Sequence, residues 1–147
     1  MVGRVVGLAL GAVLVAGGCA PRTPRIAVGA LAPGLDTFLD GHPLGADQVI
    51  RVDEVGRTPG ASYHLVQVRG QERPHRHQTH DVTVFVLRGH GTLTLGAERL
   101  PLAAGDGALV PRGLPHWFAN EGRTAAVAFA VFTPPLDAPD NVPEAGR

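Results

Sequence analysis

Four residues with metal-binding side chains lie close together near the middle of the chain. They are His75, His77, His80 and Asp81, and an apolar, β-branched run that ends at Gly89 follows them directly. Neutral imidazole and carboxylate are common ligands of divalent transition metals. Because alternate side chains of a strand point to the same face, His75 and His77 would direct two nitrogens at one point. The alternative is a solvated polar loop before a core strand, and a further ligand elsewhere in the chain would argue against it.

The composition indicates one small domain without a charge bias. The chain has 147 residues, and its 13 basic and 13 acidic side chains balance, so no nucleic-acid partner is expected. The 13 prolines and 20 glycines favour many short elements joined by tight turns over a helical bundle.

The beginning of the chain has the layout of an export signal. Arg4 precedes an apolar run over 5–16, and small residues lead to Cys19, the only cysteine. The run is shorter than the about 20 residues of a membrane-spanning helix. The stretch before Cys19 resembles a bacterial lipobox, although Ala16 stands where that motif prefers leucine. The resemblance implies lipidation of Cys19 and a protein anchored to the membrane on the extracytoplasmic side of a bacterial envelope. The alternative is an ordinary signal peptide cut near Ala20.

The rest of the chain divides into a tether, one domain and a tail. After a signal peptide at 1–18, residues 19–44 are rich in proline and glycine, with at most one helical turn expected at 36–40. Residues 45–135 hold short apolar or alternating segments separated by turns, which predict an all-β sandwich or barrel. Residues 136–147 are expected to be extended. The predicted strands cover 48–52, 62–68, 82–87, 92–95, 98–102, 108–110, 115–118 and 124–132.

A further histidine lies in a second motif downstream. The spacing there is a glycine, five residues, Pro-x-Gly, two residues, His, three residues and Asn, at Gly105, Pro111, Gly113, His116 and Asn120. This pattern resembles the second motif of the cupin superfamily. In a barrel, strands distant in sequence come together, so His116 could join the earlier histidines.

The earlier stretch resembles the first cupin motif, which runs from a glycine through His-x-His and an acid to a second glycine. Gly70, His75, His77 and Gly89 carry this resemblance. The chain is therefore similar to small single-domain bacterial cupins of the type-2 kind. The resemblance implies a double-stranded β-helix, a jelly-roll barrel, that holds one divalent transition metal. Imidazole and carboxylate ligands suit Fe, Mn, Ni, Cu or Zn without distinguishing them.

The acidic ligand is left open by the two motifs. Counting forward from His77 gives Asp81, whereas counting back from Gly89 gives Val82, which cannot bind a metal. Strict alternation would also turn Asp81 away from the face of Val82, unless a β-bulge restored it. The expected ligands are therefore His75, His77, His116 and Asp81, with His80 as the alternative to Asp81. A site of three histidines, or no site, remains open.

These features predict an exported, lipid-anchored, metal-binding cupin with an unidentified small-molecule ligand. The first hypothesis is an enzyme of dioxygenase or isomerase type, in which no general base is evident and Tyr63, His64 and Asp81 are only candidates for one. The second is a noncatalytic binding protein of the cell envelope, and the third is an accessory lipoprotein whose metal only stabilises the barrel, since fold does not fix function. By analogy with other cupins, a homodimer would form through an edge strand at 124–132. The expected cavity lining is Val84, Val86, Leu109 and Phe129.

Overall fold

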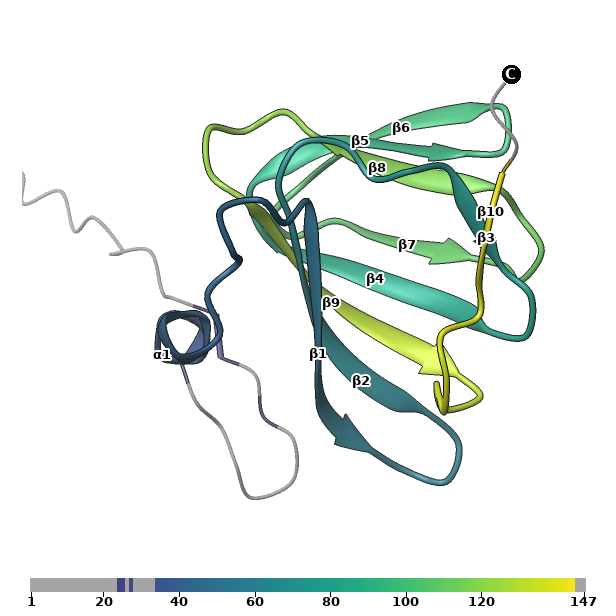
Figure 1. The fold of residues 1–147 in the computed structure, drawn as a ribbon, viewed down its shortest axis with the longest axis horizontal. Helices are drawn as coiled ribbons and strands as arrows, with labels where there is room; N and C mark the ends of the chain where they lie inside the picture. The colour runs from purple at the N-terminus through teal and green to yellow at the C-terminus, as the bar shows by residue number, and fades with distance from the viewer. Residues whose placement is uncertain (1–23, 26, 28–33, 145–147) are drawn as a thin grey trace, which may run out of the picture.

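The computed structural model describes residues 24, 25, 27 and 34–144, and Figure 1 shows an almost entirely β fold. Within these residues, ten strands form two five-stranded antiparallel sheets that face each other. The expected all-β double-stranded β-helix of jelly-roll type is thereby confirmed. The predicted signal peptide and Cys19 lie outside the described residues, as does part of the predicted tether.

The first sheet has the apolar strand at 124–132 in its centre rather than at its edge. Its order is β1 (Ile50–Arg57), β2 (Ser62–Val68), β9 (Ala126–Thr133), β4 (Asp81–Arg88) and β7 (Gly107–Val110). β9 pairs with β2 on one side and with β4 on the other. The expectation of an edge strand there is wrong, because a strand that is apolar on both faces suits a central, doubly covered position.

The second sheet brings the histidine-bearing strands together. Its order is β10 (Asn141–Pro143), β3 (His75–His77), β8 (His116–Asn120), β5 (His90–Leu95) and β6 (Glu98–Ala103). β3 pairs with β8 through His75 and His116. The last strand, β10, drawn in yellow in Figure 1, pairs along β3 with Asn141 opposite His77. The C-terminal segment thus lies directly beside the candidate ligands.

A short helix covers part of the outer face of the first sheet. α1 (Leu35–Gly41) is longer than the single turn expected, because Leu35, Phe38 and Leu39 recur at helical spacing and pack on the sheet. Leu35 is fully buried and packs in one cluster with Leu65 and Val127. Among the described residues, no helix has the length and apolar character needed to cross a membrane.

The two sheets enclose a cavity of about 390 Å³. Val84 and Val86 line it as expected, but Leu109 is exposed and Phe129 packs in the cluster beneath α1. The expectation for these two residues is wrong because of strand register. Leu109 pairs with Thr83, and Phe129 pairs with Phe85, at positions that alternate with the inward valines of β4.

Candidate metal centre

Three histidines from two neighbouring strands meet at the cavity wall. His75 and His77 lie two apart on β3 and so share a face, and His116 of β8 pairs with His75 across the strands. One ring nitrogen of each lies within 4.8 Å of the others. The ring centroids of His75 and His116 are 4.3 Å apart. His77 and His116 are buried, and His75 is half-buried. This group could hold a metal ion.

Two of these rings are oriented by the chain immediately before them. Nδ1 of His75 donates to the carbonyl oxygen of Arg73 at 2.9 Å. Nδ1 of His116 donates to the carbonyl oxygen of Leu114 at 3.0 Å. A carbonyl oxygen only accepts, so in each ring Nδ1 carries the hydrogen and Nε2 keeps its lone pair.

The third ring is oriented by a carboxylate from the far end of the chain. Nδ1 of His77 donates to Oδ1 of Asp140 at 2.8 Å. Burial would raise the pKa of Asp140, but hydrogen bonds from His80, His77 and Thr79 hold that pKa well below its usual range. Asp140 is therefore an anion that accepts from His77. As in the other two rings, Nε2 is the nitrogen left for a metal.

Burial keeps the buried imidazoles in the form that a metal needs. Desolvation lowers the pKa of His77, and it lowers the pKa of His116 to about 4. The neighbouring histidines lower the pKa of His116 further, because a second positive charge beside it is unfavourable. Both rings are thus neutral at neutral pH, and only the neutral ring offers a lone pair.

Asp81, a predicted ligand, does not join the three histidines. The carboxylate of Asp81 accepts two kinds of hydrogen bond from Arg112: one from the backbone N–H at 2.9 Å and one from the guanidinium at 2.7 Å. These bonds lower the pKa of Asp81 to about 2. The β-bulge that would have turned it inward is absent there: β4 pairs regularly with β9 from Asp81 to Val86. Alternation therefore leaves Val82, not Asp81, in the cavity lining.

His80, the alternative ligand, does not join the three histidines either. It is buried, with Nδ1 2.5 Å from Oδ2 of Asp140 and Nε2 3.2 Å from the carbonyl oxygen of Pro135. Both ring nitrogens are thus engaged by oxygen atoms, which leaves neither for a metal. Among the described residues, the structure brings together His75, His77 and His116 as potential ligands and adds no fourth metal-binding side chain to this group.

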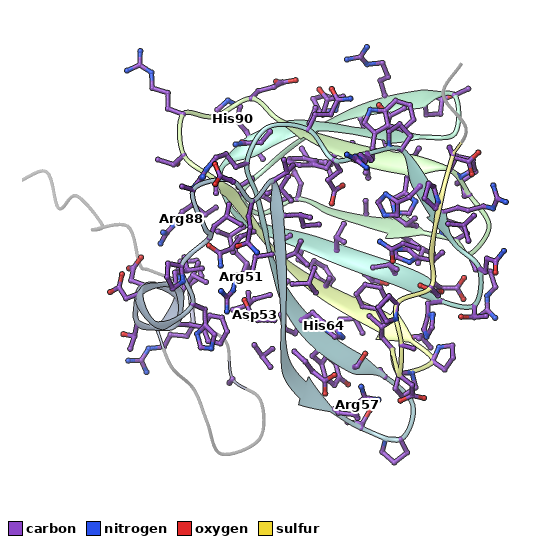
Figure 2. The ribbon with its side chains drawn as sticks, in the orientation of Figure 1. Arg51, Asp53, Arg57, His64, Arg88 and His90 are labelled. Atoms are coloured by element: carbon purple, nitrogen blue, oxygen red, sulfur yellow. The ribbon has the colours of Figure 1, made fainter. Side chains whose placement is uncertain are left out.

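The two candidates for a general base on β2, His64 and Tyr63, do not line the cavity. His64 of β2, labelled in Figure 2, is buried with Nε2 2.8 Å from Oγ of Ser62. Ser62 is itself fully buried and also accepts the backbone N–H of Leu136. Desolvation lowers the pKa of His64, which makes it a neutral packing residue. Tyr63 stacks against Phe129, with ring centroids 6.1 Å apart.

Sequence reasoning missed two carboxylates at this site. Glu72 lines the cavity, and its Oε2 accepts the backbone N–H of Phe118 at 2.8 Å. Burial raises the pKa of Glu72. The one available signal was its position within the first histidine motif, between Gly70 and His75. Asp140 gave no signal, because it lies in a proline-rich segment without periodicity.

The cavity is strongly asymmetric in polarity. The first sheet contributes only apolar side chains to it, mostly valine and alanine. The polar members are the three histidines, Glu72 and Asn141, and all of them lie on or beside the second sheet. Leu136 and Pro139 show that the C-terminal segment also forms part of the wall. The cavity can therefore take a small molecule with an apolar body whose polar end reaches the histidines.

Comparisons with known proteins agree with this architecture. A family model described as a cupin domain matches residues 62–132. An uncharacterized protein of Aquifex aeolicus is 38% identical over 98 residues, which cover 67% of this chain and 80% of that protein. An acireductone dioxygenase of Gluconacetobacter diazotrophicus is 28% identical over 115 residues, covering 76% of this chain but only 61% of the enzyme.

The fold also resembles solved structures. A Klebsiella pneumoniae protein with a double-stranded β-helix domain superposes with a TM-score of 0.61 at 19% identity. The match covers 74% of this chain and 95% of that chain. At this identity the likeness concerns the fold alone.

Proposed function

We propose that this chain, which belongs to the cupin superfamily, binds one divalent transition metal through Nε2 of His75, His77 and His116. The observation that carries the proposal is the uniform state of the three rings. Each Nδ1 is committed to an oxygen acceptor, so each Nε2 is free within one small cluster. Neutral imidazole suits Fe, Mn, Ni, Cu and Zn alike.

The lining of the cavity favours a particular kind of ligand. Three protein ligands leave coordination positions for oxygen atoms of a small molecule. The valine- and alanine-rich wall suits a compact apolar body, because each hydroxyl of a sugar would face a surface that offers no hydrogen bond. A catechol or a 1,3-diketone fits both requirements.

Within that cavity we assign a reaction of dioxygenase or isomerase type. The bound metal would supply Lewis-acid polarisation of substrate oxygens or a site for dioxygen. The apolar wall excludes water, and Glu72, the remaining acid in the lining, would hold or release the proton that such a reaction moves. The similarity to an acireductone dioxygenase supports this class of reaction.

The test is turnover by the metal-loaded protein. Protein stripped by a chelator is reloaded with each metal in turn, and dioxygen uptake and product formation are followed with catechols and 1,3-diketones. We expect turnover with at least one metal and none in His116→Ala. Uptake that persists unchanged in His116→Ala would contradict the proposed centre.

A noncatalytic binding function is the second candidate, and one observation favours it. Apart from the three histidines, Glu72 is the only titratable residue among the described residues that line the cavity, so groups for proton transfer are scarce. A metal-loaded protein that binds one catechol per chain by calorimetry, yet consumes neither the catechol nor dioxygen, would favour this candidate.

We further propose that the protein is exported and lipid-anchored through Cys19. The basis is the order of Arg4, an apolar run and small residues before Cys19, the only cysteine. Lipidation would hold the barrel at the extracytoplasmic membrane surface through the tether. Labelling with radioactive palmitate tests this: the wild type should carry label and Cys19→Ala should not. Equal absence of label in both would contradict the anchor.

A further inference from the structure

We infer that Asp140 is a positioning residue of the metal centre, which fixes the orientation and tautomer of His77. The inference rests on the proposed metal site. It assigns a functional role to the C-terminal segment, which lies beyond the residues that match the cupin domain, 62–132.

The carboxylate of Asp140 is held by donors on both of its oxygens. Oδ1 accepts from Nδ1 of His77 at 2.8 Å. Oδ2 accepts from the backbone N–H of Thr79 at 3.1 Å and from its hydroxyl at 3.0 Å, and it lies 2.5 Å from Nδ1 of His80. With a side chain only 12% exposed, Asp140 has little freedom to rotate. Its orientation therefore fixes the ring of His77.

His77 thus differs from the other two candidate ligands. His75 and His116 donate to carbonyl oxygens two residues before them, whereas the acceptor of His77 is an anion 63 residues away. A carboxylate that accepts from a metal-binding imidazole fixes its tautomer and increases its basicity as a ligand. Thr79 and His80 also gain a role, because their bonds to Oδ2 of Asp140 hold the carboxylate that orients His77.

The backbone around Asp140 keeps it in place independently of a metal. β10 begins at the next residue and pairs with β3, with Asn141 opposite His77. Further along, Glu144 forms an ion pair with Arg76, and its backbone N–H donates to the carbonyl oxygen of Pro74 at 3.0 Å. Strand pairing, an ion pair and a backbone hydrogen bond therefore tie this segment to β3 and the residue before it. Of the two carboxylates Asp140 and Glu144, only that of Asp140 is hydrogen-bonded to a histidine.

This arrangement supplies a matched pair of variants. Asp140→Ala removes the acceptor of His77, while Glu144→Ala removes a carboxylate from the same segment without touching a histidine. Asp140→Asn keeps a side chain of the same size but has one acceptor oxygen for donors on two sides. Zn²⁺ and Co²⁺ titrations measure metal affinity, and ¹⁵N NMR of the metal-free protein reports the protonated ring nitrogen of His77.

We expect Asp140→Ala to weaken metal binding by about 10- to 100-fold. Asp140→Asn should fall between it and the wild type, and Glu144→Ala should lower the melting temperature while leaving affinity unchanged. In the metal-free wild type, His77 should be protonated at Nδ1, and Asp140→Ala should give a mixture of tautomers. If Asp140→Ala does not fold, Asp140→Asn carries the same two measurements.

Two results would overturn the inference. One is a His77 tautomer that is the same in the wild type and the Asp140 variants. The other is an equal loss of affinity in Asp140→Ala and Glu144→Ala, which would make the role of Asp140 merely structural. A wild type that binds no metal would contradict the proposed function instead, while the tautomer measurement would still decide whether Asp140 positions His77.

Discussion

Two pairs of potential ligands lie in one short stretch, and only the first pair reaches the cavity. His75 and His77 belong to β3 and point toward His116, whereas His80 and Asp81 lie where the chain crosses to the other sheet and bond to Asp140 and Arg112. The difference teaches that residue type alone does not make a ligand here. The imidazoles that face the apolar interior have only Nδ1 engaged, whereas the second pair has its polar atoms engaged by other side chains or carbonyl groups.

Removing a ring of the first group should have the largest effect. His116→Ala deletes one of the three proposed ligands. A binding free energy of about 10–16 kcal/mol, as in structural zinc sites, shared among three ligands implies a loss on the order of 1000-fold in metal affinity. His90→Ala is the matched control, because His90 is exposed and is not among the residues that line the cavity. Elemental analysis and metal titration measure both variants. Full metal content in His116→Ala would contradict a metal site formed by His116 with His75 and His77, and nothing would then distinguish that pair from His80 and Asp81 as ligands.

Lowering the pH should act through the same buried ring. In the metal-free protein, the pKa of His116 is about 4, against 6.5 as its ordinary value. Below pH 6.5 the unfolded chain therefore binds the proton more tightly, so stability should fall as the pH drops from 6.5 and level off near 4. The loss is roughly 3 kcal/mol at most. Urea denaturation of wild type and His116→Ala measures it, and a wild-type stability that does not change over this range would contradict the burial argument.

A carboxylate placed on the inward face should create the ligand that Asp81 does not provide. Val82 lines the cavity and packs in the cluster of Phe132, whose ring lies 5.3 Å from that of His77. Val82→Glu should destabilise the metal-free protein, because it buries an acid among apolar groups, and should raise metal affinity about tenfold. Thr83→Glu, at the alternating outward position, should leave affinity unchanged. Equal metal affinities in the two variants would show that the direction in which a side chain points does not decide whether it can act as a ligand.

The barrel and the three histidines could be predicted from the sequence because their signals are local. Period-two alternation and frequent turns indicate strands, and the spacing within each histidine motif follows from one strand or one turn. Which side chains point into the cavity was harder to predict where a strand is apolar on both faces. Leu109 and Phe129 carry no polar neighbours to mark the outer face, so they were expected in the cavity.

Contacts between distant segments gave no signal at all. α1 extends beyond a single turn because Leu35 and Leu39 pack in the cluster on the first sheet, and that packing exists only in the folded chain. Asp140 meets His77 across 63 residues, and no sequence motif includes both residues. The register of Asp81 could be questioned from sequence, but its pairing with Arg112 depends on how β4 and β7 come together.

The smallest effect is expected at Asp81. Its pair with Arg112 is solvent-exposed, and such pairs stabilise little and are screened by salt. Asp81→Asn should leave metal content and affinity unchanged and should lower stability slightly, in low salt only. Because these bonds hold the pKa of Asp81 near 2, the stabilisation should persist above pH 4 and vanish as the pH falls toward 2. Metal titration and urea denaturation at two salt concentrations test both parts. A loss of affinity as large as that of His116→Ala would mean that Asp81 turns inward when metal binds, and the contrast between the two pairs would then hold only for the metal-free protein.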